Sequence, residues 1–546
     1  MSPDNTKDGE RMNPLTRWMG RFARRLPAGS MPAVMQRGHA VENYQAEFPQ
    51  TAEAFEYFLR RCQIPIVARS AKPVGVALMP WVGTPMPWYS LAIAIGLAGR
   101  GRRVQLIYDD TPSPGPTDYG RVQNQAIGAV LRRLRRYFNI VRVSDHGPQP
   151  LVEGDEQTVD RLAQLNVIWD VRARPLAPQE QQQAVGKYRQ SLTATLASLR
   201  TLLKQNEYAY WVVPGGVRQS SGLFLHVARQ VGLRASTYDA GLGWMLVSTD
   251  GVAGHQTDIG RAFHNLWQSS AGTLPDWIRL AAEQEYQRRL EASDRTSFQV
   301  AQSGRTDPVD GDDVLIPLNV EWDTAALGRH AIFDSTVDWV TEAVAFILAN
   351  YSGSVVVRQH PSERRPLERS QLGLDSVLRE RFGQQPRLRF VRAEEPISSY
   401  DLLQSAALVL PCVSTIAMEA AALGKPVLVS GVSYYSDLGF VWSADTREDY
   451  FHLLGRGLRG QLPIKPQQQD KAWLCYYLTQ IHNRTWTDFT PQPTDFWRWV
   501  KIPPDQLLAD PVVTQILTAI DENIPLSLLR HWSSPQQPEA ELSRGG

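Results

Sequence analysis

The sequence predicts an α/β protein in which two doubly wound parallel-sheet domains face each other across a cleft. Buried strands alternate with helices over about 65–300, and the alternation restarts at about 314. Residues 301–313 (AQSGRTDPVDGDD) separate the two stretches, and their Gly, Asp and Pro content is typical of an interdomain linker. We therefore expect domains at 65–300 and 314–500.

The first stretch opens with a strand, a helix and a second strand, which is the repeating unit of a parallel sheet. Apolar runs mark the strands, and Gly99 and Gly101 end the first helix. The expected strands are 74–79, 104–108, 140–143, 210–213 and 235–238, and the expected helices are 91–97, 121–138 and 222–231.

The second stretch repeats this pattern and predicts a second sheet over about 314–445. The expected strands are 314–318, 355–358, 388–391, 407–410 and 427–430, and the expected helices are 337–348, 399–405 and 416–423. Residues 501–546 should hold C-terminal helices to about 530, followed by a Pro-, Gln- and Glu-rich disordered tail.

Residues 1–60 form an N-terminal extension that contains a short basic amphipathic helix at 15–26. Such a helix lies in a lipid headgroup region or docks on the protein's own surface, and both interpretations stay open. Its apolar residues are Leu15, Trp18, Met19, Phe22 and Leu26, and its arginines are Arg17, Arg21, Arg24 and Arg25. A second arginine group lies on the 121–138 helix and comprises Arg132, Arg133, Arg135 and Arg136. If both elements bind lipid, they seat the protein on an anionic membrane.

Composition excludes several classes of protein. Lys and Arg number 57 against 56 Asp and Glu, so the net charge of +1 gives no reason to expect a nucleic-acid partner. The three cysteines are far apart and suit neither a disulfide framework nor a metal site. No apolar run is long enough to cross a bilayer. We expect a cytoplasmic protein, with a peripheral position on the inner face of the cytoplasmic membrane as the alternative.

Ligands of open parallel sheets bind beyond the carboxyl ends of the strands, so residues that follow strands are the site candidates. Ser414 and Thr415 follow a strand and open a helix, where free backbone N–H groups and the helix dipole favour phosphate. Glu419 lies one turn further along the helix and could accept hydrogen bonds from ribose hydroxyls. The competing interpretation is a capped helix with a solvent-facing carboxylate.

Another strand ends in the segment VVVRQHPSE, where Pro361 stops the ladder. Arg358 suits bidentate contact with phosphate, and His360 can donate a hydrogen bond to phosphate or a proton to a leaving group. The competing interpretation is an arginine paired with an acid and a histidine at the surface.

These motifs carry a resemblance. The His-Pro dipeptide at 360–361 and the Ser-Thr pair 54 residues later resemble the HP and SS/ST motifs of bacterial sialyltransferases and Kdo transferases. The stretch STIAMEAAALGKPVLVSG with the following SYYSDLGF looks like the capsule polysaccharide biosynthesis protein family. The resemblance spans about 205–445 and is strongest over 314–440.

The resemblance implies a GT-B glycosyltransferase, a fold of two Rossmann-like domains, whose nucleotide-sugar donor is a co-substrate. It assigns the donor phosphate to His360, Ser414 and Thr415, and the ribose to Glu419. The sialyl and Kdo enzymes use CMP-sugars, but the AAALGKP segment also resembles enzymes that use UDP- or GDP-sugars. The identity of the donor nucleotide therefore stays open. GT-B enzymes manage leaving-phosphate charge with helix ends and basic side chains. With no convincing D-x-D motif in the sequence, we expect no obligatory metal or cofactor.

The acceptor half of the site is expected at the end of strand 235–238. Asp239 follows this strand, and Gly241 lets the backbone turn into the cleft. The D-x-G pattern partly resembles the acidic D/E-D/E-G motif of the same families, whose first acid is the catalytic base; Ala240 replaces the middle acid. The resemblance makes Asp239 the candidate base, and an Asx-turn residue is the competing interpretation.

Further residues that follow strands are candidates for acceptor or cleft contacts. Glu321 and Asp323 follow the first strand of the second sheet, and the loop around Gly83 carries tryptophans that could stack on sugar rings or pack in the core. The cleft set is Gly83, Trp88, Gly215, Gly216, Arg218, Gly241, Glu321 and Asp323.

The predicted function is transfer of a sugar from a CMP-, UDP- or GDP-linked donor to a growing capsular or other cell-surface polysaccharide, with a lipid-linked or polysaccharide acceptor. Two alternatives are a polyol-phosphate transferase of the CDP-glycerol type and a catalytically inactive GT-B scaffold of an assembly complex. A nucleotide-sugar 2-epimerase is a weaker alternative because it needs no acceptor cleft.

Overall fold

The structure is a computed structural model that describes residues 53–294, 313–486 and 502–529, apart from 54, 63–70, 82–85, 112–113, 115–116, 241–243, 250 and 367. The predicted amphipathic helix at 15–26, the linker from 301 to 312, Gly83, Gly241 and the tail from Ser533 lie outside the described residues.

The first sheet has the strand order β11-β6-β5-β4-β1-β2-β3. The five strands from β5 to β3 in this order are parallel, β6 runs antiparallel to β5, and the short β11 runs antiparallel to β6. The strands are β1 (Val74–Leu78), β2 (Val104–Tyr108), β3 (Asn139–Arg142), β4 (Tyr210–Pro214), β5 (Ala235–Ala240), β6 (Trp244–Ser248) and β11 (Thr485–Trp486). The five predicted strands are therefore confirmed, whereas β6 and β11 were not expected.

The second sheet has four parallel strands in the order β10-β7-β8-β9. The strands are β7 (Asp313–Pro317), β8 (Val355–Arg358), β9 (Leu388–Val391) and β10 (Ala406–Val409). The fifth predicted strand, 427–430, appears as single bridges from Val427 to Val409 and from Leu428 to Trp442. In the first sheet β1 lies between β2 and β4, and in the second sheet β7 lies between β8 and β10. The chain therefore extends each sheet in both directions from its first strand, which makes both sheets doubly wound.

The continuous apolar runs form the strands because helices cover both faces of each sheet. Every residue of β1, β2, β4 and β7 is buried. The helices of the first half are α3 (Met86–Gly99), α4 (Thr117–Leu134), α5 (Asp155–Asp170), α6 (Pro178–Gln205), α7 (Ser221–Gln230), α8 (Ile259–Ser269) and α9 (Asp276–Leu290). Those of the second half are α10 (Thr336–Asn350), α11 (Leu374–Phe382), α12 (Ser399–Ser405), α13 (Ile416–Ala422), α14 (Arg447–Leu458), α15 (Gln468–Tyr476), the π-helix η4 (Tyr477–His482), α17 (Pro504–Ala509), α18 (Pro511–Glu522) and α19 (Leu526–Leu529).

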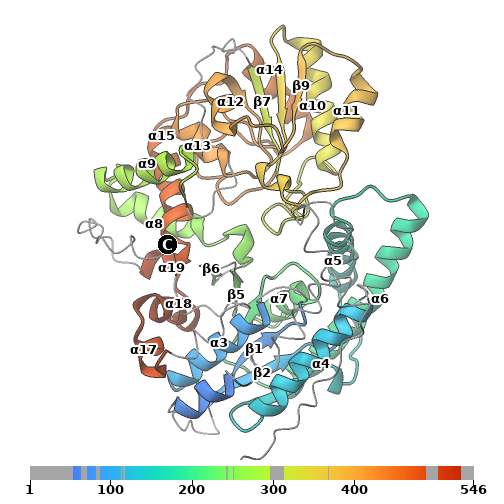
Figure 1. Ribbon diagram of the computed structural model, residues 1–546, viewed down its shortest axis with the longest axis vertical. Coiled ribbons are helices and arrows are strands. Elements are labelled where there is room, and N and C mark those ends of the chain that lie inside the picture. Colours follow the sequence, from blue (N-terminus) through green and yellow to red (C-terminus); the bar gives the residue numbers. More distant parts are fainter. Residues whose placement is uncertain are drawn as a thin grey trace, which may run out of the picture.

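The chain crosses between the two domains, so helices on either side of the expected second domain pack where the linear order alone does not place them. Helices α8 and α9 precede the linker, yet Phe263 and Ile278 are buried in the core of the second domain. Helices α17 to α19 end the described chain, yet Leu517 and Leu526 are buried in the core of the first domain. Figure 1 shows α8 and α9 beside α15, and α18 beside α3. The fold class is confirmed: two Rossmann-like parallel-sheet domains, each built largely from one half of the chain.

Candidate functional site

The two domains meet at the carboxyl ends of their strands, and the predicted base lies there. Asp239 follows Tyr238 near the end of β5 and is half-buried. A Cβ atom built on Gly254 would lie 3.1 Å from Asp239 Oδ2 and 2.7 Å from the side chain of Thr324 in the second domain. Asp239 Oδ1 accepts a hydrogen bond from the amide of Ala240 at 2.9 Å. One carboxylate oxygen is thus held by the backbone, and the other lies at the domain junction.

The electrostatics of Asp239 suit proton transfer. Burial raises the pKa of Asp239, and the negative charge of Asp323 raises it further, to about 7. Asp323 follows β7 in the second domain, and burial also raises its pKa. Two carboxylates from different domains therefore share one region, and at neutral pH Asp239 exchanges protons readily.

His360 is the second residue after β8, and its ring is held in one orientation. Its Nδ1 accepts the backbone N–H of Ser362 at 3.3 Å and lies 2.8 Å from the Ser362 hydroxyl. Burial lowers the pKa of His360 to about 4, with a smaller contribution from the charge of Arg358. The neutral ring therefore carries its proton on Nε2, which has no partner among the described residues. Nε2–H is available as a donor to a ligand.

Ser414 and Thr415 lie at the start of α13, and both are half-buried. No hydrogen bond occupies either hydroxyl in the part of the chain that the structure describes. The turn itself is fixed from two sides, because Tyr435 donates to the Ser414 carbonyl at 2.8 Å and the Val413 amide donates to Asn319 Oδ1 at 3.2 Å. Asn319 follows β7, which lies between β10 and β8. The open hydroxyls and His360 thus belong to the same carboxyl edge of the second sheet.

Arg358, predicted to contact donor phosphate, is not open to a ligand in this structure. The side chain is 1% exposed and all of its guanidinium nitrogens are engaged within the protein. Nη2 donates to the Ile397 carbonyl at 2.9 Å, Nε donates to the Ser399 hydroxyl at 3.3 Å, and Nη1 donates to the Arg392 carbonyl. Arg358 therefore holds the loop between β9 and α12 in place.

Glu419 is likewise not open to a ribose in this structure. Glu419 is 2% exposed, and its Oε1 accepts hydrogen bonds from Arg289 Nη1 and from the Tyr400 hydroxyl, both at 3.1 Å. Arg289 comes from α9, which the sequence placed in the other domain. Because the chain crosses between the domains, this cation reaches Glu419. No sequence pattern around residue 419 predicts the ion pair.

Glu321 does not face a free cleft. Its carboxylate pairs with His330 Nε2 at 3.0 Å and also accepts a hydrogen bond from the hydroxyl of Thr336. The other ring nitrogen of His330 lies 3.8 Å from Cys412 Sγ. Burial alone would lower the pKa of His330, but Cys412 and Glu321 outweigh burial and raise it. The sequence analysis missed His330 because it follows neither a strand nor a recognised motif.

The aromatic platform expected near Gly83 is not formed by Trp88. Trp88 lies within α3, is 2% exposed and packs in the core beside Phe55, with ring centroids 6.2 Å apart. Trp81 is 5% exposed and lies against Gly215, where an added Cβ would approach its ring to 2.6 Å. Core packing is therefore the correct interpretation of both indoles.

The turn after β4 does place glycines in the left-handed region, with φ of 68° at Gly215 and 98° at Gly216. Arg218, which follows, stacks its guanidinium 3.0 Å from the centroid of the Trp169 ring. Burial lowers the pKa of Arg218 to about 9. Arg218 was predicted to contact a ligand, but in this structure its guanidinium stacks on the ring of Trp169.

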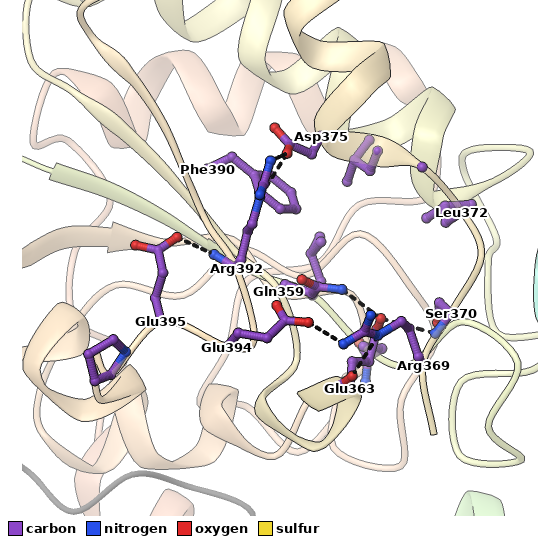
Figure 2. A pocket seen from close by; sticks show the side chains of 15 residues that line it. Gln359, Glu363, Arg369, Ser370, Leu372, Asp375, Phe390, Arg392, Glu394 and Glu395 are labelled. Atoms are coloured by element: carbon purple, nitrogen blue, oxygen red, sulfur yellow. Dashed lines mark hydrogen bonds and ion pairs between the residues drawn. The ribbon is translucent and has the colours of Figure 1, made fainter. Parts of the chain in front are cut away.

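A pocket of about 670 Å³ opens beside this edge, at the carboxyl ends of β7, β8 and β9 (Figure 2). Its polar side chains hold one another: Arg392 pairs with Asp375, Arg369 pairs with Glu394, and Gln359 donates to Glu363 at 2.8 Å. The charged lining comprises four carboxylates and two guanidiniums, namely Glu363, Asp375, Glu394, Glu395, Arg369 and Arg392.

The formal charge of −2 makes this pocket unfavourable for phosphate, and both guanidiniums already have carboxylate partners. A phosphate group is better accommodated beside His360, Ser414 and Thr415, where the open polar groups are donors. Within the described ranges, no three His, Cys, Asp or Glu residues are grouped so that they could hold a metal ion. None of the described helices is long and apolar enough to cross a membrane.

Comparisons with known proteins give distant similarities only. No family model and no curated protein matches the chain. Among solved structures, a beta Kdo 2,4 transferase, KpsC of Thermosulfurimonas dismutans, is 14% identical, with 55% of this chain and 88% of that chain covered and a TM-score of 0.33. The S. aureus MnaA–UDP structure is 12% identical, covering 84% of this chain and 98% of that chain with a TM-score of 0.28. WaaG, a glycosyltransferase involved in lipopolysaccharide biosynthesis, is 14% identical, covering 77% and 97% with a TM-score of 0.28. These identities and TM-scores indicate distant similarity, and the strand order and register of the chain itself define its fold.

Proposed function

We propose that the protein is a glycosyltransferase that transfers a sugar from a nucleotide-sugar donor to a cell-surface glycan. The observation that carries this proposal is the junction of the two domains, where a carboxylate with a pKa of about 7 comes from the first domain. The second domain contributes open hydrogen-bond donors at the carboxyl edge of its sheet, from His360 and from the start of α13. These are the two kinds of group that a sugar transfer needs.

The first domain would activate the acceptor. As the acceptor hydroxyl attacks the anomeric carbon of the donor, its proton passes to Asp239 Oδ2. A base with a pKa near 7 is largely deprotonated just above neutral pH and still basic enough to take this proton. Asp323 supports the reaction by keeping that pKa high.

The second domain would stabilise the leaving nucleotide. When the bond from the anomeric carbon to the phosphate oxygen breaks, negative charge develops on the phosphate. His360 Nε2–H and the hydroxyls of Ser414 and Thr415 are donors with no other partner among the described residues, and α13 begins directly beside them. Glu419 and Arg358 take no part in this step because both are engaged in the protein interior.

The acceptor that we propose is a lipid-linked or polysaccharide chain used at the cytoplasmic face of a membrane. Exposed arginines on and just after α4 support this position: Arg132, Arg133, Arg135 and Arg136. Arg133 and Arg136 are paired with Glu56, whereas no described acid pairs with Arg132 or Arg135. Anionic vesicles that carry the acceptor should therefore support faster transfer than neutral vesicles.

The test combines nucleotide binding with turnover. Purified protein is screened against CMP, UDP, GDP and CDP by thermal shift, because a ligand that binds only the folded state raises the Tm. We expect His360→Ala to weaken the shift of the preferred nucleotide at an unchanged Tm of the free protein. Asp239→Asn should keep the shift and lose about 10²–10⁴-fold in turnover.

A matched control is Ser436→Ala, because Ser436 also lies at this end of the second domain but its hydroxyl accepts from the Ser433 amide at 2.8 Å. This variant should keep the nucleotide shift. If no nucleotide raises the Tm of the wild type, the enzyme proposal fails and the scaffold interpretation takes its place. If the variant at Asp239 turns over normally, the base is a different residue.

A further inference from the structure

Five side chains of alternating aromatic and cationic character run across the junction of the domains. We call them the Trp–Arg ladder: Trp81, Arg218, Trp169, Arg172 and Trp322. The Arg218 guanidinium carbon lies 5.6 Å from the centroid of Trp81 and 3.0 Å from that of Trp169. The Arg172 guanidinium carbon lies 4.7 Å from the centroid of Trp169 and 3.6 Å from that of Trp322.

The ladder links elements that are far apart in the sequence. Trp81 follows β1, Arg218 follows β4, and Trp169 lies at the end of α5, all in the first domain. Trp322 follows β7 in the second domain, and its ring meets that of Trp169 edge to face at 6.0 Å. Within the ladder, Arg172 is therefore the residue of the first domain whose cation reaches an aromatic ring of the second.

The backbone of Arg172 is also committed to the second domain. Its carbonyl accepts a hydrogen bond from the amide of Gln371 at 2.6 Å. Arg172 and Ala173 have φ of 54° and 57°, which is the left-handed region. Each such residue costs on the order of 1 kcal/mol and persists only where its surroundings fix it. Here the surroundings include the second domain, so the turn after α5 is shaped by the domain contact.

The far end of the ladder adjoins the candidate base. Trp322 is the chain neighbour of Asp323, and the charge of Asp323 reaches Asp239 across the junction. The other charged groups that act on Asp323 are Arg172 and Glu368. His255, on the turn that faces Asp239, is neutral because burial lowers its pKa to about 4.

We propose that Arg172 is a positioning residue: stacked between Trp169 and Trp322, it holds the second domain in the orientation that places Asp323 beside Asp239. The link to catalysis rests on the proposed role of Asp239 as the base. The orientation of the domains does not, because it is a property of the folded chain whatever its activity.

The experiment uses the full chain and the variants Arg172→Lys and Arg172→Gln. Lysine keeps the positive charge but has no planar group to stack between two indoles. Small-angle scattering measures the distribution of distances between the domains, and the pH dependence of kcat measures the apparent pKa of the base. The control is Arg234→Lys, because Arg234 stacks 4.0 Å from the centroid of Tyr210 within the first domain.

We expect both Arg172 variants to broaden the distance distribution while keeping the cooperative unfolding of the wild type. The acid limb of the kcat profile should move down by about one pH unit, because Asp239 loses its carboxylate neighbour and gains solvent. Arg234→Lys should change neither readout.

Unchanged scattering in both variants would overturn the proposal. Changed scattering with an unchanged pH profile would overturn the link between the ladder and the base. If the wild type shows no transfer at all, the proposed function fails, and the scattering arm still decides whether Arg172 sets the domain orientation.

Discussion

Arg358 is the last residue of β8 and His360 lies two residues further along the chain, yet their side chains have different surroundings. Arg358 turns into the protein and donates to the carbonyls of Arg392 and Ile397, whereas the Nε2 of His360 stays free of any described partner. The same contrast separates Glu419, paired with Arg289 in the interior, from Ser414 at the start of the same helix. Groups that protein partners already satisfy stabilise the fold, and groups left open are available to a ligand.

The largest effect that this contrast predicts is on stability, at Glu419. Replacing Glu419 by Leu removes the nearer of two carboxylates that pair with the buried guanidinium of Arg289, and Asp294 remains 3.7 Å from Nε. Breaking a buried pair costs up to about 3–5 kcal/mol. We expect a lower free energy of unfolding, measured by urea denaturation. Glu380→Gln on the exposed side of α11 is the matched control and should stay within about 0.5 kcal/mol of the wild type.

The opposite result at Glu419 would be informative. If the Leu variant unfolds like the wild type and no longer binds nucleotide, Glu419 leaves Arg289 when a ligand enters. The assignment of ribose to Glu419, which the resemblance implied, would then be restored, and the contrast with Ser414 would disappear.

The continuous apolar runs were sufficient to predict the parallel strands of both sheets, because a strand covered on both faces needs such a run whatever its partner. They did not predict β6 and β11. They also could not predict that Phe263 and Leu517 pack in the domain other than the one their position in the sequence indicates. An amphipathic helix specifies that it buries one face, but not against which core. The pairing of Glu419 with Arg289 follows from this crossing and was hidden for the same reason.

The candidate site was predicted in part. Position after a strand located Asp239, His360 and Ser414 at carboxyl edges, because parallel strands bring their carboxyl ends to one side. Side-chain direction was not accessible, since one residue of register turns a side chain from the interior to the edge. For that reason Arg358 and Trp88 were assigned to ligands and lie in the interior instead.

A second prediction concerns Asp239 in the first domain, whose ionised carboxylate should lower the stability of the protein at high pH. The folded-state pKa of Asp239 is about 7, above its ordinary value of 3.8, so the folded protein binds this proton more tightly than the unfolded chain does. Stability from this group is present below pH 4 and is lost as the pH rises through 7. We expect Asp239→Asn to be more stable than the wild type at pH 8, with a difference that shrinks toward pH 4. Urea midpoints across this range measure it.

Asp145→Asn serves as the control, since Asp145 is exposed at the surface of the first domain and the substitution should change the urea midpoint little. A constant difference for Asp239→Asn would mean that the carboxylate ionises as in the unfolded chain. The proposed base would then lack the raised pKa on which its role depends.

The smallest effect is expected in the pocket beside the candidate donor site. Arg392 is exposed and pairs with Asp375, and its backbone amide donates to Glu395 at 2.7 Å (Figure 2). Water screens an exposed pair of this kind, so Arg392→Gln should hardly change the free energy of unfolding. Because the pocket carries more carboxylates than guanidiniums, it should not hold the phosphate, and the Kd for the preferred nucleotide should stay within about two-fold by calorimetry.

His360→Ala, measured alongside, should weaken the binding of the same nucleotide by at least about ten-fold in Kd. The reverse ranking of the two variants would place the phosphate among the paired side chains of the pocket, and the distinction between satisfied and open groups would then fail as a guide to this site.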